Sequence, residues 1–254
     1  MRLRILGGFG GNLPSCYMTS FLLDDSIVID AGSITYALEL EEQIKIKHVV
    51  LSHGHFDHIN GLPFFLDNIF GQNTDSIKIY SHRPTLDSLK KHLFNGETWP
   101  DFTQIVSNGV PLLAYEEISA HEPFRIENFR ITPVEVNHLV PTLGYAIEED
   151  GGAAFVYTAD TGETDAIWEL ANKTPNLKAI IAETSYPNKM EELAKISRHL
   201  TPSLLGRELK KLENKVPILV CHIKPSYMPT IQQELTEIDG WDVAFLKQGK
   251  TYEF

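Results

Sequence analysis

Short apolar runs separated by polar, turn-forming residues recur along the chain, and this pattern predicts many β-strands. A strand is expected wherever a short apolar, β-branched or aromatic run stands between turn residues. By this criterion we expect strands at Leu3–Leu6, Thr19–Leu23, Ile27–Asp30, His48–Ser52, Ile77–Ser81, Phe124–Ile126, Phe129–Glu135, Gly144–Glu148, Ala153–Thr158, Ala179–Glu183 and Val216–Cys221. Hairpin turns are indicated at Asp24 and Asp25 and at the segment from Asp150 to Gly152.

Stretches of helical character lie between these strands. We expect helices near Tyr36–Glu42, Gly61–Asp67, Pro84–Leu93, Asp165–Ala171, Pro202–Leu212 and Met228–Glu237. Proline is favoured in the first turn of a helix, and Thr201 is the expected N-cap of the helix that begins at Pro202. Two strand-rich blocks, each flanked by helices, predict an α/β sandwich in which two sheets pack together with helices outside.

Composition is ordinary for a soluble globular protein. The 254 residues are 43% hydrophobic and 22% charged. The absence of repeats, low-complexity segments and linkers rich in Pro, Gly or Ser predicts one domain, residues 1–254. No stretch approaches the roughly 20 apolar residues of a membrane span, and the N-terminus lacks the long apolar core of a signal peptide. These features predict a cytoplasmic protein.

The formal net charge of −12 argues against an extended nucleic-acid-binding surface, which needs a basic stripe. It does not exclude an anionic small substrate, because bound cations dominate the local field of a site. The two cysteines, Cys16 and Cys221, are too few for a disulfide framework. Cys221 precedes a candidate ligand, His222, but we interpret it as a small buried hydrophobic residue.

The densest chemical signal follows the predicted strand His48–Ser52. Three imidazoles and a carboxylate fall within six positions, at His53, His55, Asp57 and His58. Imidazole and carboxylate are the ligands of hydrolytic zinc sites. In an extended segment, residues two apart point the same way, so His53 and His55 are expected to bind one ion. Asp57 and His58 lie on the following turn and are expected to face a second ion. Solvated loop histidines are the alternative, which we consider a poor explanation for so dense a cluster.

Three further polar residues stand at the ends of predicted strands, where ligands of a shared cleft are expected. They are His138, Asp160 and His222. Each alone is weak evidence, because an aspartate after a strand is often a turn residue and a lone histidine is often structural. Together with the first cluster they complete an inventory of five histidines and two aspartates, which suits two metal ions.

The order His-x-His-x-Asp-His followed by isolated His, Asp and His resembles the metallo-β-lactamase superfamily. Its fold is an αβ/βα sandwich of two mixed β-sheets packed face to face. Further blocks, spread over most of the chain, resemble class II cyclic-nucleotide phosphodiesterases. These blocks are Asp30–Ser33, Leu51–Leu62, Phe94–Pro100, Glu183–Pro187, His199–Pro202 and His222–Pro225. Phe56 departs from the leucine that is usual in that subfamily.

The resemblance implies a dinuclear metal centre whose two ligand sets share one aspartate. The implied sets are His53, His55 and His138 for one ion and Asp57, His58 and His222 for the other, with Asp160 as the bridge. Zinc is expected for a His-rich, thiolate-free set, with manganese or iron as alternatives. The implied reaction is hydrolysis of cyclic AMP or cyclic GMP to the nucleoside 5′-phosphate by a metal-bridging hydroxide, with Asp57 among the catalytic residues.

The same resemblance assigns two residues to proton transfer. His199 is the expected donor to the leaving oxygen, and Glu183 would orient it and favour its protonated form. Spacing alone leaves them equally well explained as a loop residue and a polar strand terminus. Phe94, Asn95 and Trp99 are candidates for binding a purine base, or alternatively for anchoring a loop.

Two rival functions remain. A tRNA 3′-end processing endonuclease of the same superfamily shares the metals and a Glu–His donor pair, but this chain is acidic and has no Lys-rich arm for tRNA. A non-catalytic metal- or nucleotide-binding module is expected to lack a ligand, whereas every expected ligand is present. Lys224 is either a phosphate contact or a solvated residue. The resemblance also suggests a homodimer, and no membrane partner is expected.

Overall fold

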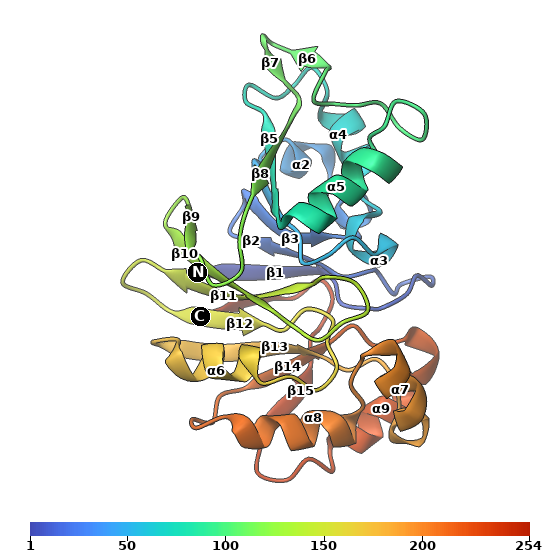
Figure 1. Ribbon diagram of the computed structural model, residues 1–254, viewed down its shortest axis with the longest axis vertical. Coiled ribbons are helices and arrows are strands. Elements are labelled where there is room, and N and C mark those ends of the chain that lie inside the picture. Colours follow the sequence, from blue (N-terminus) through green and yellow to red (C-terminus); the bar gives the residue numbers. More distant parts are fainter.

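The computed structural model describes residues 1–254, which form two seven-stranded sheets with helices on their outer faces (Figure 1). The first sheet has the strand order β16-β1-β2-β3-β4-β5-β8. Its strands are β1 (Arg2–Gly7), β2 (Ser20–Leu23), β3 (Ile27–Ala31), β4 (His48–Val50), β5 (Ile77–Ser81), β8 (Leu113–Glu117) and β16 (Thr251–Glu253). The chain's two ends pair in this sheet, because β16 lies antiparallel to β1.

The second sheet has the order β15-β14-β13-β12-β11-β10-β9. Its strands are β9 (Phe124–Ile126), β10 (Phe129–Glu135), β11 (Leu143–Glu149), β12 (Ala154–Tyr157), β13 (Leu177–Glu183), β14 (Ile218–Cys221) and β15 (Val243–Phe245). Both sheets are mixed, with antiparallel pairs between β16 and β1 and among β1–β3 and β9–β12, and parallel pairs in the remainder. A separate hairpin consists of β6 (Val106–Ser107) and β7 (Val110–Pro111).

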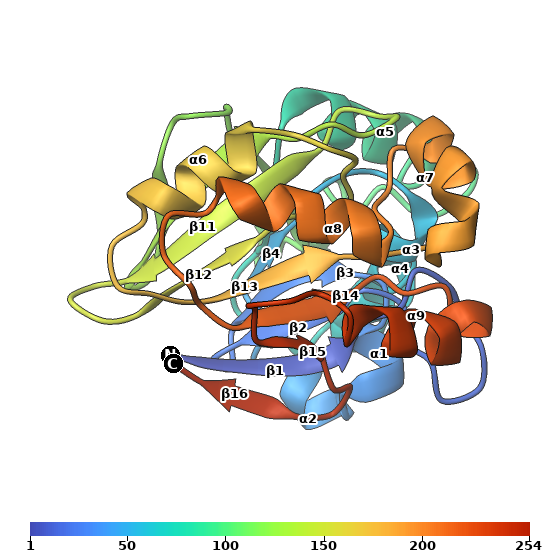
Figure 2. The same ribbon diagram turned by 90° about the horizontal axis from the view of Figure 1, so that it is seen from below.

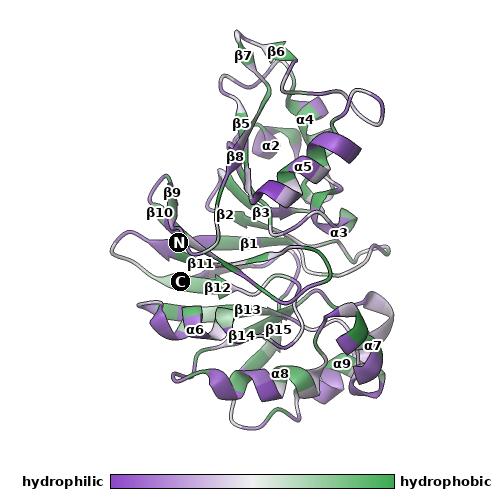
Figure 3. Ribbon diagram, in the orientation of Figure 1, coloured by the Kyte–Doolittle hydropathy of each residue, from purple (hydrophilic) through white to green (hydrophobic).

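Helices cover the outer face of each sheet. The first sheet carries α1 (Ile34–Ala37), α2 (Leu40–Gln43), α3 (Phe56–Ile59), α4 (Leu62–Ile69) and α5 (Arg83–His92). The second carries α6 (Ala166–Lys173), α7 (Glu191–Ser197), α8 (Pro202–Glu208) and α9 (Met228–Leu235), with single 3-10 turns at Asn188–Met190, Leu209–Lys211 and Pro225–Tyr227. Hydrophilic and hydrophobic bands alternate along these helices, as expected where one side is buried (Figure 3). None of the helices combines the length and apolar character needed to cross a bilayer.

Three apolar cores hold the layers together. The central core lies between the sheets, where Phe21 from β2 meets Phe129 and Phe155 from the second sheet, all fully buried. The other two cores lie between each sheet and its helices, and Phe65 and Trp168 are among their largest members. The predicted αβ/βα sandwich is confirmed by this layered arrangement.

Several predicted elements match the structure closely, and others needed correction. Strands β5, β9 and β10 have the predicted bounds. The single helix predicted near Tyr36–Glu42 was wrong, because the chain forms two short helices there. Glu39 is extended and caps α2 in a reciprocal capping box with Glu42, which interrupts the helix. The helix at Pro202 begins as predicted, with the Thr201 hydroxyl accepting from Leu204 N at 3.3 Å, but its α-helical part ends at Glu208.

The sandwich has one end at which many strands finish. In the second sheet β12, β13 and β14 are parallel, and β10 runs in the same direction because β11 is antiparallel to both β10 and β12. In the first sheet β3 and β4 are parallel. Figure 2 shows α3, α7 and α9 together at one end of the molecule. Loops that follow parallel strands meet at one edge, which is where ligand sites form in such sheets.

Candidate metal centre

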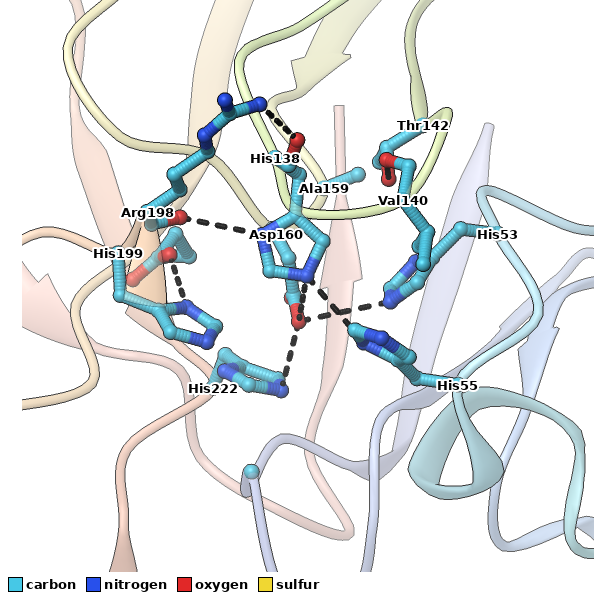
Figure 4. Close-up of polar contacts among 12 residues, drawn as sticks. His53, His55, His138, Val140, Thr142, Ala159, Asp160, Arg198, His199 and His222 are labelled. Carbon is cyan, nitrogen blue, oxygen red and sulfur yellow. Dashed lines mark hydrogen bonds and ion pairs between the residues drawn. The ribbon is translucent and has the colours of Figure 1, made fainter. Parts of the chain in front are cut away.

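The seven predicted ligands converge at this end of the sandwich, from both halves of the chain. Figure 4 shows five of them, His53, His55, His138, Asp160 and His222. His53 and His55 lie in the loop after β4, and Asp57 and His58 lie in α3. The other three follow strands of the second sheet: His138 follows β10, Asp160 follows β12 and His222 follows β14. Residues 169 positions apart in sequence therefore share one site.

The side chains form two adjoining groups. Ligand atoms of His53, His55, His138 and Asp160 all lie within 4.8 Å of one another. A second group with the same spacing consists of Asp57, His58 and His222. Apart from Asp160, which lies in the first group, the two groups contain the same residues as the two ligand sets that the resemblance implied.

Asp160 lies between the two groups and is almost fully buried. Its Oδ2 atom is 3.7 Å from His53 Nε2 in the first group. The same oxygen is 3.4 Å from His58 Nε2 and 3.1 Å from His222 Nε2 in the second group. One carboxylate thus faces ligand atoms of both sets, which is the geometry that a bridging residue needs.

Unpaired buried atoms show that these side chains fit cations. His53 Nε2, His58 Nε2 and Asp160 Oδ1 are buried without a hydrogen-bond partner. Buried polar atoms nearly always have a hydrogen-bond partner. Three unpaired atoms so close together indicate that this space accommodates a further group that pairs with them. Nitrogen and carboxylate oxygen atoms in a thiolate-free set suit divalent metals such as zinc.

The protonation of two imidazoles is consistent with this fit. Burial, reinforced by neighbouring imidazoles, holds the pKa of His53 well below its usual value. Burial lowers the pKa of His138 to about 4, although Asp160 opposes the shift. Both rings are therefore neutral near neutral pH, and the neutral ring is the form that binds a metal.

Hydrogen bonds to the second ring nitrogen orient four of the imidazoles. His58 Nδ1 is 2.8 Å from Asp30 Oδ2, and His138 Nδ1 is 3.1 Å from the carbonyl oxygen of Arg198. The corresponding partners of the other two rings are Ser52 Oγ for His53 and Ser185 Oγ for His222, at 3.0 and 2.9 Å. With Nδ1 engaged, each Nε2 is directed to the centre. Sequence reasoning did not assign these supporting roles.

Backbone strain is concentrated at the same place. Asp30, Ala159, Arg198 and His222 all have left-handed backbone conformations, with φ between 52° and 58°. Non-glycine residues rarely adopt this region, at a cost of about 1–3 kcal/mol in sparsely populated conformations. His222 belongs to a metal group, and Asp30 and Arg198 are hydrogen-bond partners of His58 and His138, so the strain accompanies the convergence of the loops.

The Glu183–His199 pair adjoins the centre. Glu183 ends β13 and is fully buried, and its Oε1 atom is 2.6 Å from His199 Nδ1. Backbone N–H groups of Thr161 and Leu200 also donate to this carboxylate, each at 3.2 Å. Burial opposes a charge on His199, but the Glu183 carboxylate outweighs burial and raises the pKa of His199. A nitrogen of His199 lies within 4.8 Å of ligand atoms of Asp160 and His222.

The candidate base-binding residues of the segment Phe94–Trp99 make local packing and hydrogen-bond contacts. Phe94 is only 2% exposed and packs in the core against Phe102. The Asn95 side chain accepts hydrogen bonds from the backbone N–H groups at positions 97 and 98, at 2.9 and 2.7 Å. Trp99 packs edge-on against Phe64. None belongs to the groups around the centre, and their contacts are those of residues that anchor a loop, the alternative stated above.

The contacts of Lys224 and Cys221 indicate that both residues have structural roles. The Lys224 ammonium donates to the carbonyl oxygen of Gly10 at 2.5 Å, so it holds a loop against the site. A side chain at Gly10 would meet the His222 ring at 2.6 Å, which explains why this loop carries a glycine there. Cys221 is buried in the central core and lies outside the metal groups, as its interpretation as a small hydrophobic residue requires.

Comparison with known proteins identifies relatives that match most of the chain. Residues 26–223 match the family described as "Beta-lactamase superfamily domain". A probable 3′,5′-cyclic-nucleotide phosphodiesterase of Yersinia pestis is 30% identical over 242 residues, covering 82% of this chain and 68% of the relative. A 3′,5′-cyclic-nucleotide phosphodiesterase of Aliivibrio fischeri is 25% identical, covering 96% of this chain and 88% of the relative.

Other similarities are structural or partial. The unliganded crystal structure of yeast PDE1 has a TM-score of 0.82 at 20% identity and covers 98% of both chains, which shows the shared fold. A Ribonuclease Z of Pyrococcus horikoshii is 30% identical over 107 residues, covering 42% of this chain and 32% of the relative.

Proposed function

Because this chain belongs to the metallo-β-lactamase superfamily of hydrolases, we propose that it is a dinuclear metal-dependent 3′,5′-cyclic-nucleotide phosphodiesterase. The observation that carries the proposal is the buried Glu183–His199 pair beside a seven-residue centre. Hydrolysis of a ribose phosphodiester needs a proton donor for the leaving alkoxide, and this pair supplies one. The relatives named for this activity support the choice of substrate.

The proposed ligands are the two groups described above, with Asp160 shared between them. When bound, two divalent cations, zinc in this proposal, supply Lewis acidity and positive charge for the phosphoryl oxygens. The imidazoles and carboxylates of the two groups would hold these cations, and the buried Asp30 and Ser185 keep the rings of His58 and His222 in orientation.

His199 acts as the proton donor in this proposal. Its Nδ1 is engaged by Glu183, which leaves Nε2 as the nitrogen that gives a proton to the departing ribose oxygen. The raised pKa of His199 keeps that proton available near neutral pH. Release of the 3′ oxygen yields a nucleoside 5′-phosphate.

The test is a metal analysis of the purified protein combined with a product-resolved hydrolysis screen. Cyclic AMP, cyclic GMP, a 2′,3′-cyclic nucleotide and bis(4-nitrophenyl) phosphate are the substrates, and chromatography separates the products. We expect about two metal ions per chain and formation of 5′-monophosphate. Formation of the 3′-monophosphate alone would contradict the role of His199, and inertness of both cyclic nucleotides would refute the proposed substrate.

A tRNA 3′-end processing activity is the second candidate, favoured by the partial match to Ribonuclease Z. The net charge of −12 disfavours it, because binding of a long polyanion needs clustered cations. A precursor tRNA belongs in the same screen. Its cleavage by a protein that leaves cyclic nucleotides untouched would decide for this alternative.

A further inference from the structure

A cavity of about 160 Å³ lies against the metal centre on the side of His55. Three segments that are distant in sequence line it. They are Gly54 and His55 after β4, Pro84, Thr85 and Ser88 in α5, and Val140 and Pro141 between β10 and β11. Figure 4 shows Val140 on the side of the centre where His53 and His55 lie. His55 belongs both to the first metal group and to the wall of this cavity.

The lining has the chemistry of a site for a neutral organic group. Two prolines and Val140 provide apolar walls, and Thr85 and Ser88 provide hydroxyl groups. Apolar walls with a few hydrogen-bonding groups are typical of small-molecule sites. No lysine, arginine or carboxylate lines the cavity, so it offers nothing to a phosphate or an ammonium group.

The size of the cavity indicates that it takes one part of a ligand. Sites for whole drug-sized ligands enclose about 300–1,000 Å³, and this cavity has about half the lower value. Gly54 and Ser88 face each other at its wall, since a Cβ atom at position 54 would lie 3.6 Å from Ser88 Oγ, in ordinary van der Waals contact. Because His55 belongs to both the cavity wall and the first metal group, the outer part of a ligand whose phosphate lies at the centre can extend into the cavity.

We propose that this cavity receives the heterocyclic base of a nucleotide whose phosphate lies at the metal centre, a proposal that rests on the proposed function. The walls pack against the faces of the base, and the hydroxyl groups of Thr85 and Ser88 form hydrogen bonds with its edge. The segment Phe94–Trp99 is then a structural element, and the residues that set base preference lie on α5 and on the loop after His138.

The test compares ligands with and without a base by calorimetric titration of the zinc-loaded protein. The ligands are adenosine 5′-monophosphate, guanosine 5′-monophosphate and ribose 5-phosphate. In the natural protein we expect at least one nucleotide to bind about tenfold more tightly than ribose 5-phosphate. Ser88→Leu fills the cavity and should abolish this difference while leaving the affinity for ribose 5-phosphate within about twofold.

Two further variants provide a control and a substitute for Ser88→Leu. Ser203→Leu makes the same change at an exposed position of α8, in a cavity that does not touch the centre, and should retain the preference for a base. Gly54→Ala narrows the cavity with a smaller change and serves if Ser88→Leu does not fold.

Equal affinity of nucleotides and ribose 5-phosphate in the natural protein overturns the proposal, as does a preference that survives both cavity variants. The binding measurement involves no turnover. Failure to hydrolyse cyclic nucleotides would therefore refute the proposed function without changing the interpretation of the binding data.

Discussion

At the scale of single residues, Ser185 connects the candidate metal centre to His199, the proposed proton donor. Its hydroxyl oxygen is 2.9 Å from His222 Nδ1, 3.3 Å from Glu183 Oε2 and 3.2 Å from His199 Nδ1. When His222 presents Nε2 to the centre, its Nδ1–H donates to Ser185, and the serine proton is free to reach Glu183. One buried carboxylate thereby supports both the donor His199 and the ring of His222.

Ser185→Ala is predicted to weaken metal binding selectively. Loss of a hydrogen-bond partner behind a metal-binding histidine costs about 10–100-fold in affinity. We expect this loss for the group that contains Asp57, His58 and His222, with the other ion retained. A competition titration against a chromophoric chelator measures both affinities.

Ser107→Ala is the matched control, because Ser107 is also buried and accepts one hydrogen bond, from Gly71 N, in the distant β6–β7 hairpin. Equal weakening of both ions by Ser185→Ala, or the same effect from the control, would show that Ser185 has only a general structural role.

His199→Ala is predicted to slow substrates according to their leaving groups. A positioned general acid contributes about 10²–10⁴-fold when the departing group needs a proton, as a ribose oxygen does. A nitrophenolate leaves without a proton, so hydrolysis of bis(4-nitrophenyl) phosphate should fall far less than that of a cyclic nucleotide. The measurement is kcat/KM for both substrates. Equal slowing of the two would count against acid catalysis by His199.

At the scale of elements, α8 is tied to α6 by one buried carboxylate. Glu208 is 2% exposed, and its Oε2 atom accepts from Trp168 Nε1 at 2.7 Å and from Thr164 N at 2.9 Å. The other carboxylate oxygen, Oε1, forms an ion pair with Lys211 Nζ at a distance of 2.7 Å. Because α8 begins three residues after His199, this contact fixes the helix that follows the loop carrying His199.

Glu208→Ala is predicted to lower the free energy of unfolding by about 3 kcal/mol, because it leaves a buried indole N–H and a backbone N–H without acceptors. Denaturant unfolding measures the change. Glu237→Ala, at an exposed position, is the control and should shift stability by less than about 0.5 kcal/mol. A loss below 1 kcal/mol for Glu208→Ala would show that water or a neighbouring group replaces the carboxylate.

At the scale of the whole molecule, the centre joins the two halves of the sandwich. His53, His55, Asp57 and His58 belong to the first sheet's connections, whereas His138, Asp160 and His222 belong to those of the second. Cations held between them would link loops from both halves and would pair with the three buried atoms that lack a hydrogen-bond partner. We therefore expect folding and metal binding to be coupled.

Removal of the metals by a chelator is predicted to lower the melting temperature. A ligand at 100 times its dissociation constant stabilises the folded state by about 2.7 kcal/mol, which corresponds to roughly 5–10 °C for a chain of this size. Differential scanning calorimetry with and without added zinc measures the shift. His53→Ala should show a smaller shift, and an unchanged melting temperature in the natural protein would disprove the coupling.

Local sequence determined much of this architecture. Strand β10 has its predicted bounds because apolar runs and turn residues act on near neighbours, and Thr201 caps α8 because an N-cap needs only the next turn. The seven candidate ligands stand out in the sequence because metal binding restricts residue types, and four of them fall within six positions.

Only the tertiary structure decided which side chains form hydrogen bonds with the candidate ligands and which candidate site residues lie elsewhere. Asp30 meets His58 across 28 positions within the first half of the chain, and it meets Tyr157 across 127 positions where the two sheets pack together. Phe94 looks the same in sequence whether it binds a base or fills a core, and packing placed it in the core. The cavity beside His55 is built from three distant segments, so no local pattern could reveal it.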